Sequence, residues 1–463
     1  MTEHAQDSFS TLPLRPPLLQ SLESLGFDSM TPIQAESLPL VLAGTDVIGQ
    51  GKTGSGKTAA FALGVLNKLD VKRFQIQSLI LCPTRELADQ VAKEIRRLAR
   101  NIHNIKVLTL CGGMPFGPQI NSLEHGAHIV VGTPGRIEEH VRKQHLQLGK
   151  VTTLVLDEAD RMLQMGFQQA LDAIIGQVPQ QRQSLLFSAT YPEAIEAMAT
   201  RYMREPVFLK VASTHNATSI KQVFYSVKND DRSGAVKTLL LHAQAASAVI
   251  FCNTKREVKE LAELLNGAGY CAAALHGDLE QRDRDQALVR FANGSVNVLV
   301  ATDVAARGLD VDDLELVVNY QIPRDPEVYV HRIGRTGRAG AKGRSFTLCS
   351  DKELHKLAAL ESLQDDRFVL EQLPKAPAKV PAEQAPKMVT LQIDGGKKQK
   401  VRPGDIVGCL TGEDGVTQND IGKINVFDFS AYVAVDRSVF RQALKKIQTG
   451  TLKGRRFRVR LLD

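Results

Sequence analysis

The chain lacks the features of membrane, secreted and disulfide-stapled proteins. It has no run of 18 or more apolar residues, so we expect no membrane-spanning helix. Its start, MTEHAQDSFS, has neither a basic nor an apolar segment, so no secretory signal is expected. Six cysteines are scattered through 463 residues without a CxxC spacing, which favours free thiols over disulfides or a zinc site. The sequence therefore predicts a cytoplasmic protein.

Basic and acidic residues balance over most of the chain, which therefore has no net charge there. Residues 1–386 carry 43 Lys+Arg and 43 Asp+Glu, whereas residues 387–463 carry 15 against 8. The formal net charge of +7 therefore lies entirely in the C-terminal segment. A basic segment on a neutral body is typical of proteins that bind nucleic acid or another anionic surface. A tail that only improves solubility is the alternative.

Strand-like apolar runs alternate with helical stretches twice along the chain. The first series occupies 46–50, 78–83, 128–134, 153–160 and 184–190, and the second occupies 248–254, 271–278, 296–303 and 314–320. The runs end in motif-like residues, as do strands of open parallel α/β sheets. We predict two α/β domains, residues 1–210 and 211–363, then a proline-rich linker at 364–386 and a small domain at 387–463.

A glycine-rich string, GKTGSGKT at 51–58, follows the first strand-like run. Glycine lets the backbone N–H groups of such a loop face phosphate oxygens at the start of a helix. Lys57 is expected to reach the β and γ phosphates of ATP, and Thr58 is expected to bind Mg²⁺. The predicted loop contacts are Gly51, Thr53, Gly54, Ser55 and Gly56. An accidental glycine-rich loop is the alternative.

Two further strings complete the predicted chemistry. In DEAD at 157–160, which follows an apolar run, Asp157 is the expected Mg²⁺ partner and Glu158 the expected base for the attacking water. In HRIGRTGR at 331–338, Arg332, Arg335 and Arg338 recur every three residues. An arginine beside the γ-phosphate accelerates hydrolysis by roughly 10³–10⁵. The alternative for the DEAD string is an acidic run on the surface. The alternative for the arginines is that they bind RNA phosphates.

With these strings in place, residues 9 to about 363 resemble the DEAD-box ATP-dependent RNA helicases. The resemblance implies two tandem RecA-like domains that ATP and RNA draw together. It implies an adenine-reading element containing Phe9, Phe27, Thr31 and Gln34, whose amide suits adenine and rejects guanine. It also implies nucleotide contact by Asp310, arginine fingers at Arg335 and Arg338, and a linking histidine at His331.

The same resemblance implies a path for RNA. Its expected contacts are Arg85, Gly113, Thr133, Arg136, Thr254, Gln281, Arg284 and Thr302. Ser188-Ala189-Thr190 resembles the element that couples hydrolysis to strand separation. One departure is Gly51, because the family more often has alanine there.

The last 77 residues have their own pattern of strand, helix, two strands, helix and strand. This βαββαβ order is that of an RNA-recognition-motif fold. Only Tyr432 offers an aromatic ring where such folds stack bases, and basic residues are plentiful instead. The expected RNA contacts are Lys397, Lys398, Lys400, Arg455 and Arg456. A protein-interaction module is the alternative.

A helicase core with this tail resembles bacterial ribosome-assembly helicases of the DEAD-box family. That resemblance implies a monomer that binds a hairpin of large-subunit ribosomal RNA in a pre-ribosomal particle. The sequence thus predicts an RNA-dependent ATPase that locally unwinds structured RNA with ATP and Mg²⁺. A non-catalytic RNA clamp is disfavoured by the intact Lys57, Asp157 and Glu158 and by both arginine fingers. A DNA helicase is the third class, and the polymer that stimulates ATPase would separate it from the first.

Overall fold

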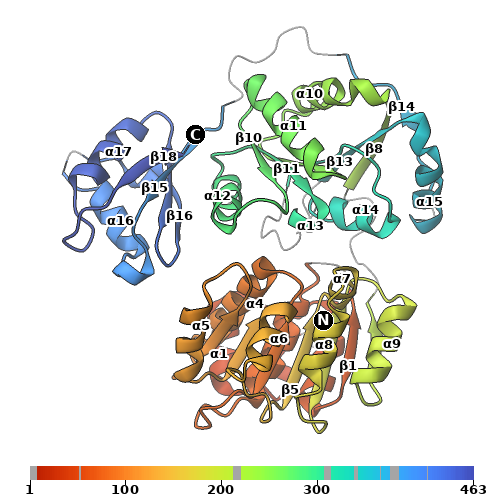
Figure 1. Ribbon diagram of the computed structural model, residues 1–463, viewed down its shortest axis with the longest axis vertical. Coiled ribbons are helices and arrows are strands. Elements are labelled where there is room, and N and C mark those ends of the chain that lie inside the picture. Colours follow the sequence, from red (N-terminus) through yellow and green to blue (C-terminus); the bar gives the residue numbers. More distant parts are fainter. Residues whose placement is uncertain are drawn as a thin grey trace. The chain divides into compact units, whose positions relative to one another are not determined.

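The computed structural model describes residues 8–51, 54–211, 220–306, 314–337, 343–364, 366–375, 385–413 and 415–462. Within these ranges it contains two parallel seven-stranded sheets and one antiparallel four-stranded sheet (Figure 1). The first sheet and its helices form one compact unit, and the second sheet and the C-terminal domain form another. No helix in the described ranges is long and apolar enough to cross a membrane. All six cysteines are free, as predicted.

The first sheet has the strand order β3-β4-β2-β5-β6-β1-β7, and every pairing is parallel. Its strands are β1 (Val47–Gln50), β2 (Ser78–Leu81), β3 (Val107–Leu110), β4 (Ile129–Gly132), β5 (Thr153–Asp157), β6 (Gln183–Ser188) and β7 (Val207–Lys210). Strands β2, β4, β5 and β6 are buried along their whole length. Burial on both faces explains why they are continuous apolar runs rather than alternating patterns.

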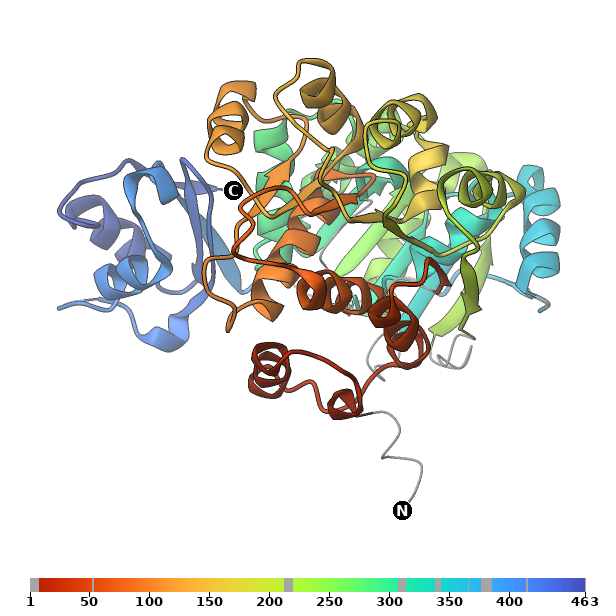
Figure 2. The same ribbon diagram turned by 90° about the horizontal axis from the view of Figure 1, so that it is seen from below.

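Helices cover both faces of this sheet. They are α1 (Pro16–Ser24), α2 (Pro32–Ala43), α3 (Lys57–Lys68), α4 (Arg85–Leu98), α5 (Phe116–Glu124), α6 (Pro134–Arg142), α7 (Ala159–Gln164), α8 (Gln168–Ile175) and α9 (Glu193–Tyr202). Phe61 and Val91 pack with Ile80 on one face, while Ile137 and Leu171 pack with residues of the opposite face. In Figure 2 the dark red α1 and α2 accordingly lie across the sheet from the golden α6 and α8.

The second sheet repeats the topology of the first. Its order, β10-β11-β9-β12-β13-β8-β14, becomes that of the first sheet when each strand number is lowered by seven. The strands are β8 (Ile220–Ser226), β9 (Ala248–Cys252), β10 (Ala272–Leu275), β11 (Val298–Thr302), β12 (Leu316–Asn319), β13 (Gly343–Cys349) and β14 (Leu370–Glu371). The helices are α10 (Arg232–Ala243), α11 (Lys255–Gly267), α12 (Gln281–Ala292), α13 (Asp303–Ala306), α14 (Pro326–Ile333) and α15 (Leu354–Gln364). The predicted pair of α/β sheets is confirmed.

The C-terminal domain has the predicted βαββαβ order. It runs through β15 (Met388–Ile393), α16 (Pro403–Leu410), β16 (Ile421–Val426), β17 (Ala431–Asp436), α17 (Phe440–Thr449) and β18 (Val459–Leu462). The sheet order is β16-β17-β15-β18, with antiparallel pairs. Leu391 and Val433 from the sheet pack with Ile406 and Ile447 from the two helices. Only one face of the sheet is therefore covered by the domain's own helices.

The other face of this small sheet meets the second α/β domain. Asn293 Nδ2 donates to Thr390 Oγ1 at 2.9 Å, and the hydroxyls of Ser295 and Thr390 lie 2.6 Å apart. Gln286 Nε2 donates to Gln392 Oε1 at 3.1 Å. Tyr432 lies beside Gln392 in the sheet and is only 2% exposed. Because an RNA-recognition motif stacks bases on this face, the expected aromatic of the tail is not offered to RNA here.

Candidate functional site

The glycine-rich loop follows β1 at the carboxyl edge of the first sheet. Gly54 and Gly56 have φ angles of 84° and 94°, which side chains rarely tolerate. A Cβ added at Gly56 would lie 2.5 Å from Gln34 Nε2 and 2.7 Å from Thr31 Oγ1. The loop therefore needs glycine for both its conformation and its packing. Thr53, a predicted contact, lies outside the described residues.

Two residues of the predicted adenine element donate hydrogen bonds to the backbone of this loop. Thr31 Oγ1 donates to the Ser55 carbonyl at 2.8 Å, and Gln34 Nε2 donates to the Gly56 carbonyl at 3.1 Å. Gln34 Oε1 accepts from the Thr31 N–H at 2.9 Å. The 3% exposed Gln34 amide is thus engaged with the loop backbone. Its adenine contact stays a prediction, and its role in positioning the loop was not foreseen from the sequence.

The aromatic part of the same element is packed into the first unit. Phe9 is 4% exposed and meets Phe27 edge-on, with ring centroids 6.2 Å apart. The guanidinium of Arg97 lies 5.4 Å from the centroid of the Phe27 ring. Nucleotide contacts by Phe9 and Phe27 also stay predictions.

Lys57 and Asp157 are buried side chains beside the loop. Lys57 opens α3, is 6% exposed and donates to the Gly51 carbonyl. Asp157 ends β5, is 3% exposed and accepts from the Glu158 N–H at 3.0 Å. Burial and, to a smaller extent, the nearby Glu158 raise the pKa of Asp157 to about 7, against the opposing effect of Lys57. A cation at this carboxylate would remove the cost of its charge.

Two other predicted residues lie at this edge of the sheet, Glu158 directly after Asp157 and Thr58 directly after Lys57. Glu158 is half-buried and has a φ of 50°. This is a strained backbone conformation for a residue other than glycine, and such strain concentrates at functional sites. Thr58 is half-buried in the first turn of α3. Among the described residues no group of three or more His, Cys, Asp or Glu could hold a metal. A hard cation at Asp157 would thus need the Thr58 hydroxyl, phosphate oxygens and water as further ligands, the donor set that Mg²⁺ uses with nucleotides.

The SAT segment joins the DEAD segment to the phosphate loop. Thr190 donates to Asp160 Oδ2 from its N–H at 3.2 Å and from its hydroxyl at 2.9 Å. The Gly51 N–H donates to the Ser188 carbonyl at 3.0 Å. Asp160 was not among the predicted site residues. Its position three residues after Asp157, with SAT ending the next strand of the sheet, was the available signal.

The predicted RNA contacts of the first unit follow adjacent strands β3, β4 and β2. Gly113 follows β3 with a φ of 73°, Thr133 and Arg136 follow β4, and Arg85 follows β2. The DEAD residues Asp157 and Glu158 lie at the end of β5 and the phosphate loop follows β1, with the SAT segment at the end of β6 between them. The carboxyl edge is therefore divided into two adjoining stretches, one for each proposed ligand.

Arg332 and Arg335 have different surroundings in the second unit. Arg332 is 2% exposed, and its guanidinium pairs with both carboxylate oxygens of Asp303, at 2.6 and 2.8 Å. It also donates to Asn253 Oδ1 at 2.9 Å. Arg332 is therefore an interior cross-link between strand ends, and the sequence spacing did not distinguish it. Arg335 is 9% exposed and His331 is half-buried, while Arg338 and Asp310 lie outside the described residues.

The other predicted RNA contacts of the second unit are engaged within it. Thr254 caps α11 and donates to Glu257 Oε2 at 2.7 Å. Gln281 Nε2 donates to Asp285 Oδ1 at 2.8 Å, and Arg284 donates to the Ala305 carbonyl at 2.8 Å. Thr302 ends β11 and is 8% exposed. Their RNA contacts stay predictions.

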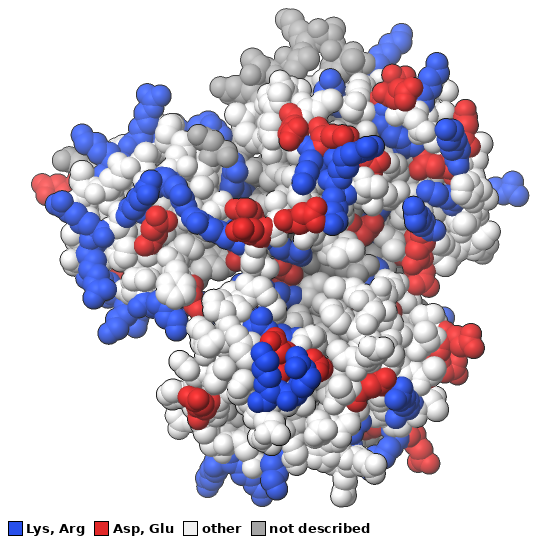
Figure 3. Space-filling view, in the orientation of Figure 1, with Lys and Arg blue, Asp and Glu red and all other residues white. Residues whose placement is uncertain are grey.

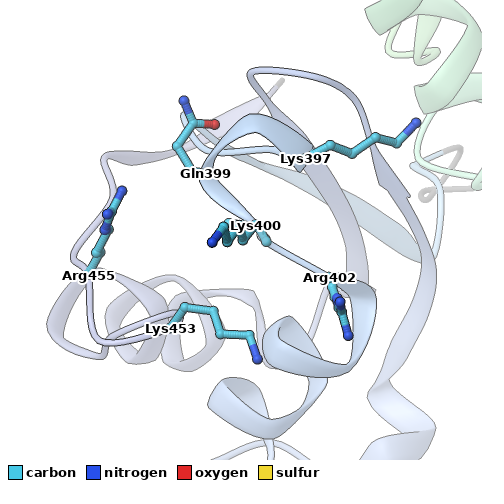
Figure 4. A pocket seen from close by; sticks show the side chains of 7 residues that line it. Lys397, Gln399, Lys400, Arg402, Lys453 and Arg455 are labelled. Carbon is cyan, nitrogen blue, oxygen red and sulfur yellow. The ribbon is translucent and has the colours of Figure 1, made fainter. Parts of the chain in front are cut away.

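A basic pocket of about 560 Å³ lies in the C-terminal domain (Figure 4). It is lined by Lys397, Gln399, Lys400, Val401, Arg402, Lys453 and Arg455. Three of the five predicted tail contacts line it, whereas Lys398 and Arg456 do not. Arg402, Lys453 and Gln399 are additional lining residues. Blue side chains also prevail on the face of this domain in Figure 3.

The backbone around this basic pocket is tightly constrained. Lys400 and Lys453 have φ angles of 63° and 54°, the left-handed region that favours glycine. The N–H groups of Lys397 and Lys398 donate to the Phe427 and Asp428 carbonyls at 2.8 and 2.9 Å. Strained backbone of this kind concentrates at functional sites.

The phosphate loop and buried carboxylate on one parallel sheet, followed by a second sheet of the same strand order, define a nucleotide-dependent enzyme of the two-sheet helicase class. Models of three protein families match successive segments of the chain. They are "DEAD/DEAH box helicase" at 31–198, "Helicase conserved C-terminal domain" at 231–340 and "DbpA RNA binding domain" at 390–461.

Individual relatives agree with these matches. The chain is 52% identical to the ATP-dependent RNA helicase DbpA of Escherichia coli over 98% of this chain and 99% of that protein. It is 47% identical to the DEAD-box ATP-dependent RNA helicase CshA of Bacillus cereus over 76% of this chain and 67% of that protein. The structure of S. cerevisiae Dbp5 bound to RNA and ADP BeF3 is similar, with a TM-score of 0.73, 32% identity and coverage of 80% of this chain and 96% of that one. The chain belongs to the DEAD-box family of ATP-dependent RNA helicases, enzymes with RNA-dependent ATPase activity.

Proposed function

We propose that this helicase acts on a hairpin of large-subunit ribosomal RNA in a pre-ribosomal particle, to which its C-terminal domain directs the ATPase core. The likeness to DbpA carries the proposal, because it extends through the tail and covers nearly the whole of both chains. The basic pocket supports it, because five cationic side chains line one cavity. Those side chains are Lys397, Lys400, Arg402, Lys453 and Arg455.

The nucleotide is proposed to bind at the carboxyl edge of the first sheet. The constrained glycine loop fits phosphate, since backbone N–H groups and the α3 N-terminus favour anions. Lys57 would contact the β and γ phosphates, and Thr58 and Asp157 would hold Mg²⁺. The raised pKa of Asp157 fits a carboxylate that a cation keeps ionised. Bound Mg²⁺ would neutralise phosphate charge and orient the terminal phosphate.

Hydrolysis is assigned to groups from both units. Glu158 would orient the attacking water and accept its proton. Arg335 and Arg338 would stabilise charge that develops on the γ-phosphate oxygens, with His331 linking them to the rest of the site. The further proposed nucleotide contacts are Phe9, Phe27, Thr31, Gln34, Gly51, Thr53, Gly54, Ser55, Gly56 and Asp310. The Asp160–Thr190 pair would carry changes at the phosphate site to the SAT segment.

RNA is proposed to bind the core through backbone contacts. The proposed residues are Arg85, Gly113, Thr133, Arg136, Thr254, Gln281, Arg284 and Thr302. In the tail they are Lys397, Lys398, Lys400, Arg455 and Arg456, to which we add Arg402 and Lys453 from the basic pocket. The division into domains at 210, 363 and 386, the monomeric state and the cytoplasmic location stay predictions.

Crosslinking in cells followed by sequencing of the bound RNA tests the ribosomal target. The wild-type chain should enrich one segment of large-subunit ribosomal RNA. A Lys400→Gly/Lys453→Gly variant should lose that peak and keep a diffuse background, because its helicase core is intact. Equal enrichment of messenger and ribosomal RNA by the wild-type chain would contradict the proposed target.

A further inference from the structure

Gln119 is a buried glutamine of α5 that joins three segments of the first unit. It is 8% exposed. Its Nε2 donates to the Cys111 carbonyl at 3.0 Å, next to the Gly113 turn. Its Oε1 accepts from the Arg136 guanidinium at 3.0 Å and pairs with His140 Nε2 at 2.9 Å. One amide thus connects the segment after β3 with two residues of α6.

The orientation of the Gln119 amide follows from its neighbours. The Cys111 carbonyl can only accept a hydrogen bond, and the guanidinium of Arg136 can only donate one. The amide nitrogen must therefore face Cys111 and the amide oxygen must face Arg136. Burial, together with the nearby Arg136 and His145, lowers the pKa of His140 to about 4. Neutral His140 consequently carries its proton on Nε2 and donates it to the same amide oxygen.

An aromatic ring completes the support of Arg136. Phe116 stacks on His140 with ring centroids 4.3 Å apart and planes inclined by 10°. The Arg136 guanidinium lies 5.2 Å from the Phe116 centroid, within cation–π range. Its NH1 group donates a second bond, to the Met114 carbonyl at 3.0 Å. Arg136 is therefore fixed to both ends of the segment 111–114, which contains Gly113.

We infer that Gln119 is a positioning residue for RNA, which fixes the spacing between the Gly113 turn and the Arg136 guanidinium so that both contact one strand. This inference rests on the proposed RNA contacts of Gly113 and Arg136. The Arg136 side chain keeps 13% of its surface exposed and its Nε pairs with Glu139 at 3.3 Å, so a phosphate would approach the remaining guanidinium nitrogen, NH2. Gln119 itself would not touch RNA, because it is buried beneath these two contacts.

Gln119→Leu in the full-length chain tests the inference, because leucine keeps the bulk and removes three hydrogen bonds. ATPase activity is measured against the concentration of single-stranded RNA. The RNA concentration for half-maximal activity should rise by about tenfold, the effect of one lost bond to a charged group. The kcat at saturating RNA and the KM for ATP should stay near wild type. Should leucine prevent folding, Gln119→Glu keeps the acceptor for Arg136, and its effect should then be smaller than tenfold.

Gln77→Leu is the matched control. Gln77 is 7% exposed and also makes three hydrogen bonds, one with the Asp70 N–H and two with the Asp70 and Arg73 carbonyls. It immediately precedes β2, at the amino edge of the sheet. Both variants should lower the melting temperature, but Gln77→Leu should leave the RNA dependence unchanged. Equal RNA dependence in the two variants would overturn the inference.

A double-mutant cycle with Arg136→Ala separates this inference from the proposed function. If Gln119 acts through Arg136, Gln119→Leu should change the half-saturating RNA concentration less than about twofold in the Arg136→Ala background. Multiplicative effects would overturn the positioning role and leave Arg136 as an RNA contact. No effect of Arg136→Ala alone would overturn both the contact and the role assigned to Gln119.

Discussion

Asp160 and Thr190 form a two-pronged hydrogen bond between the DEAD and SAT segments. The Thr190 N–H and hydroxyl reach the same carboxylate oxygen at 3.2 and 2.9 Å. The other oxygen of Asp160 accepts from the Arg161 N–H at 2.9 Å. Because Asp160 is 3% exposed, these donors take the place of the hydrogen bonds that water would make to its carboxylate. Any movement of the segment after Asp157 must therefore move the SAT segment or break these bonds.

Thr190→Val should separate ATP hydrolysis from RNA unwinding, because it removes the hydroxyl and keeps the shape of the side chain. We expect RNA-stimulated ATPase to stay within about threefold of wild type while duplex unwound per ATP falls by about tenfold, in line with a lost bond to a charged group. Thr200→Val is the control, since the Thr200 hydroxyl only bonds to the Glu196 carbonyl within α9. Parallel loss of both activities would contradict a coupling role.

Glu158→Gln should bind ATP and RNA but hydrolyse ATP about 10²–10⁴-fold more slowly, because the amide cannot accept the proton of water. Single-turnover hydrolysis and equilibrium binding of a fluorescent nucleotide measure the two effects separately. Glu193→Gln, an exposed change in α9, should leave both at wild-type values. Wild-type turnover in Glu158→Gln would remove Glu158 from the mechanism.

Arg332 and Arg335 should differ in what their loss affects. Arg332→Ala leaves the Asp303 carboxylate without its partner, so the free energy of unfolding should fall by about 3–5 kcal/mol. Arg335→Ala should mainly lower kcat, by about 10³ or more, with a much smaller change in nucleotide affinity. The same is expected for Arg338→Ala. Thermal melts and ATPase kinetics on the same samples make the comparison. Lost RNA binding at unchanged kcat in Arg335→Ala would instead make it an RNA contact.

Asp157→Asn should stabilise the nucleotide-free protein in a pH-dependent way. The raised pKa of Asp157 means that the folded protein keeps this proton up to about pH 7. The unfolded chain loses it near pH 4, so ionisation destabilises the fold increasingly between about pH 4 and 7. The gain of Asn over Asp should grow across this window, to on the order of 4 kcal/mol at most, and then level off. Denaturant unfolding from pH 4 to 8 measures it.

The control for this pH dependence is Asp278→Asn. Lys255 lowers the pKa of Asp278, so the same substitution there should give no gain that grows with pH. A pH-independent effect at Asp157 would show that burial does not raise its pKa.

The sequence alone was sufficient to predict the features of the fold and the site that depend on short segments. Continuous apolar runs such as TLVLD predicted buried parallel strands, and the βαββαβ order of the tail followed from alternating patterns. The phosphate loop was readable because its glycines are required by backbone conformation. Each of these features is decided by local chemistry, so one segment carries the signal.

Features that depend on contacts between distant segments were not readable. Arg332 and Arg335 lie in one motif, but Arg332 bonds to Asp303, which begins α13, and to Asn253, which follows β9. The bond of the Gln34 amide to the phosphate loop 22 residues away was not foreseen, while its adenine contact stays a prediction. In the tail, the fold places Arg402 and Lys453 in the lining of the basic pocket and leaves Lys398 and Arg456 outside it, and the RNA contacts of all four stay predictions. Pairing and pocket formation depend on three-dimensional neighbours that spacing does not specify.

The most direct measurement compares ATPase stimulation by a ribosomal RNA hairpin with stimulation by an unstructured RNA of equal length. It uses the wild-type chain, Lys400→Gly/Lys453→Gly and the control Lys387→Ala, whose 86% exposed side chain lies at the other end of β15. Glycine relieves about 1 kcal/mol of strain at each left-handed position, which should offset the loss of the half-exposed Lys453–Asp405 ion pair at 3.2 Å, so the double variant should fold about as well as wild type.

The wild type and Lys387→Ala should prefer the hairpin by at least about tenfold, a difference of about 1.4 kcal/mol in binding. The double variant should lose this preference and retain stimulation by unstructured RNA. Its hairpin affinity should also depend less on salt, by about 0.7–0.9 in slope for each lost phosphate contact. A double variant that still prefers the hairpin would contradict direction of the helicase by the basic pocket of its C-terminal domain.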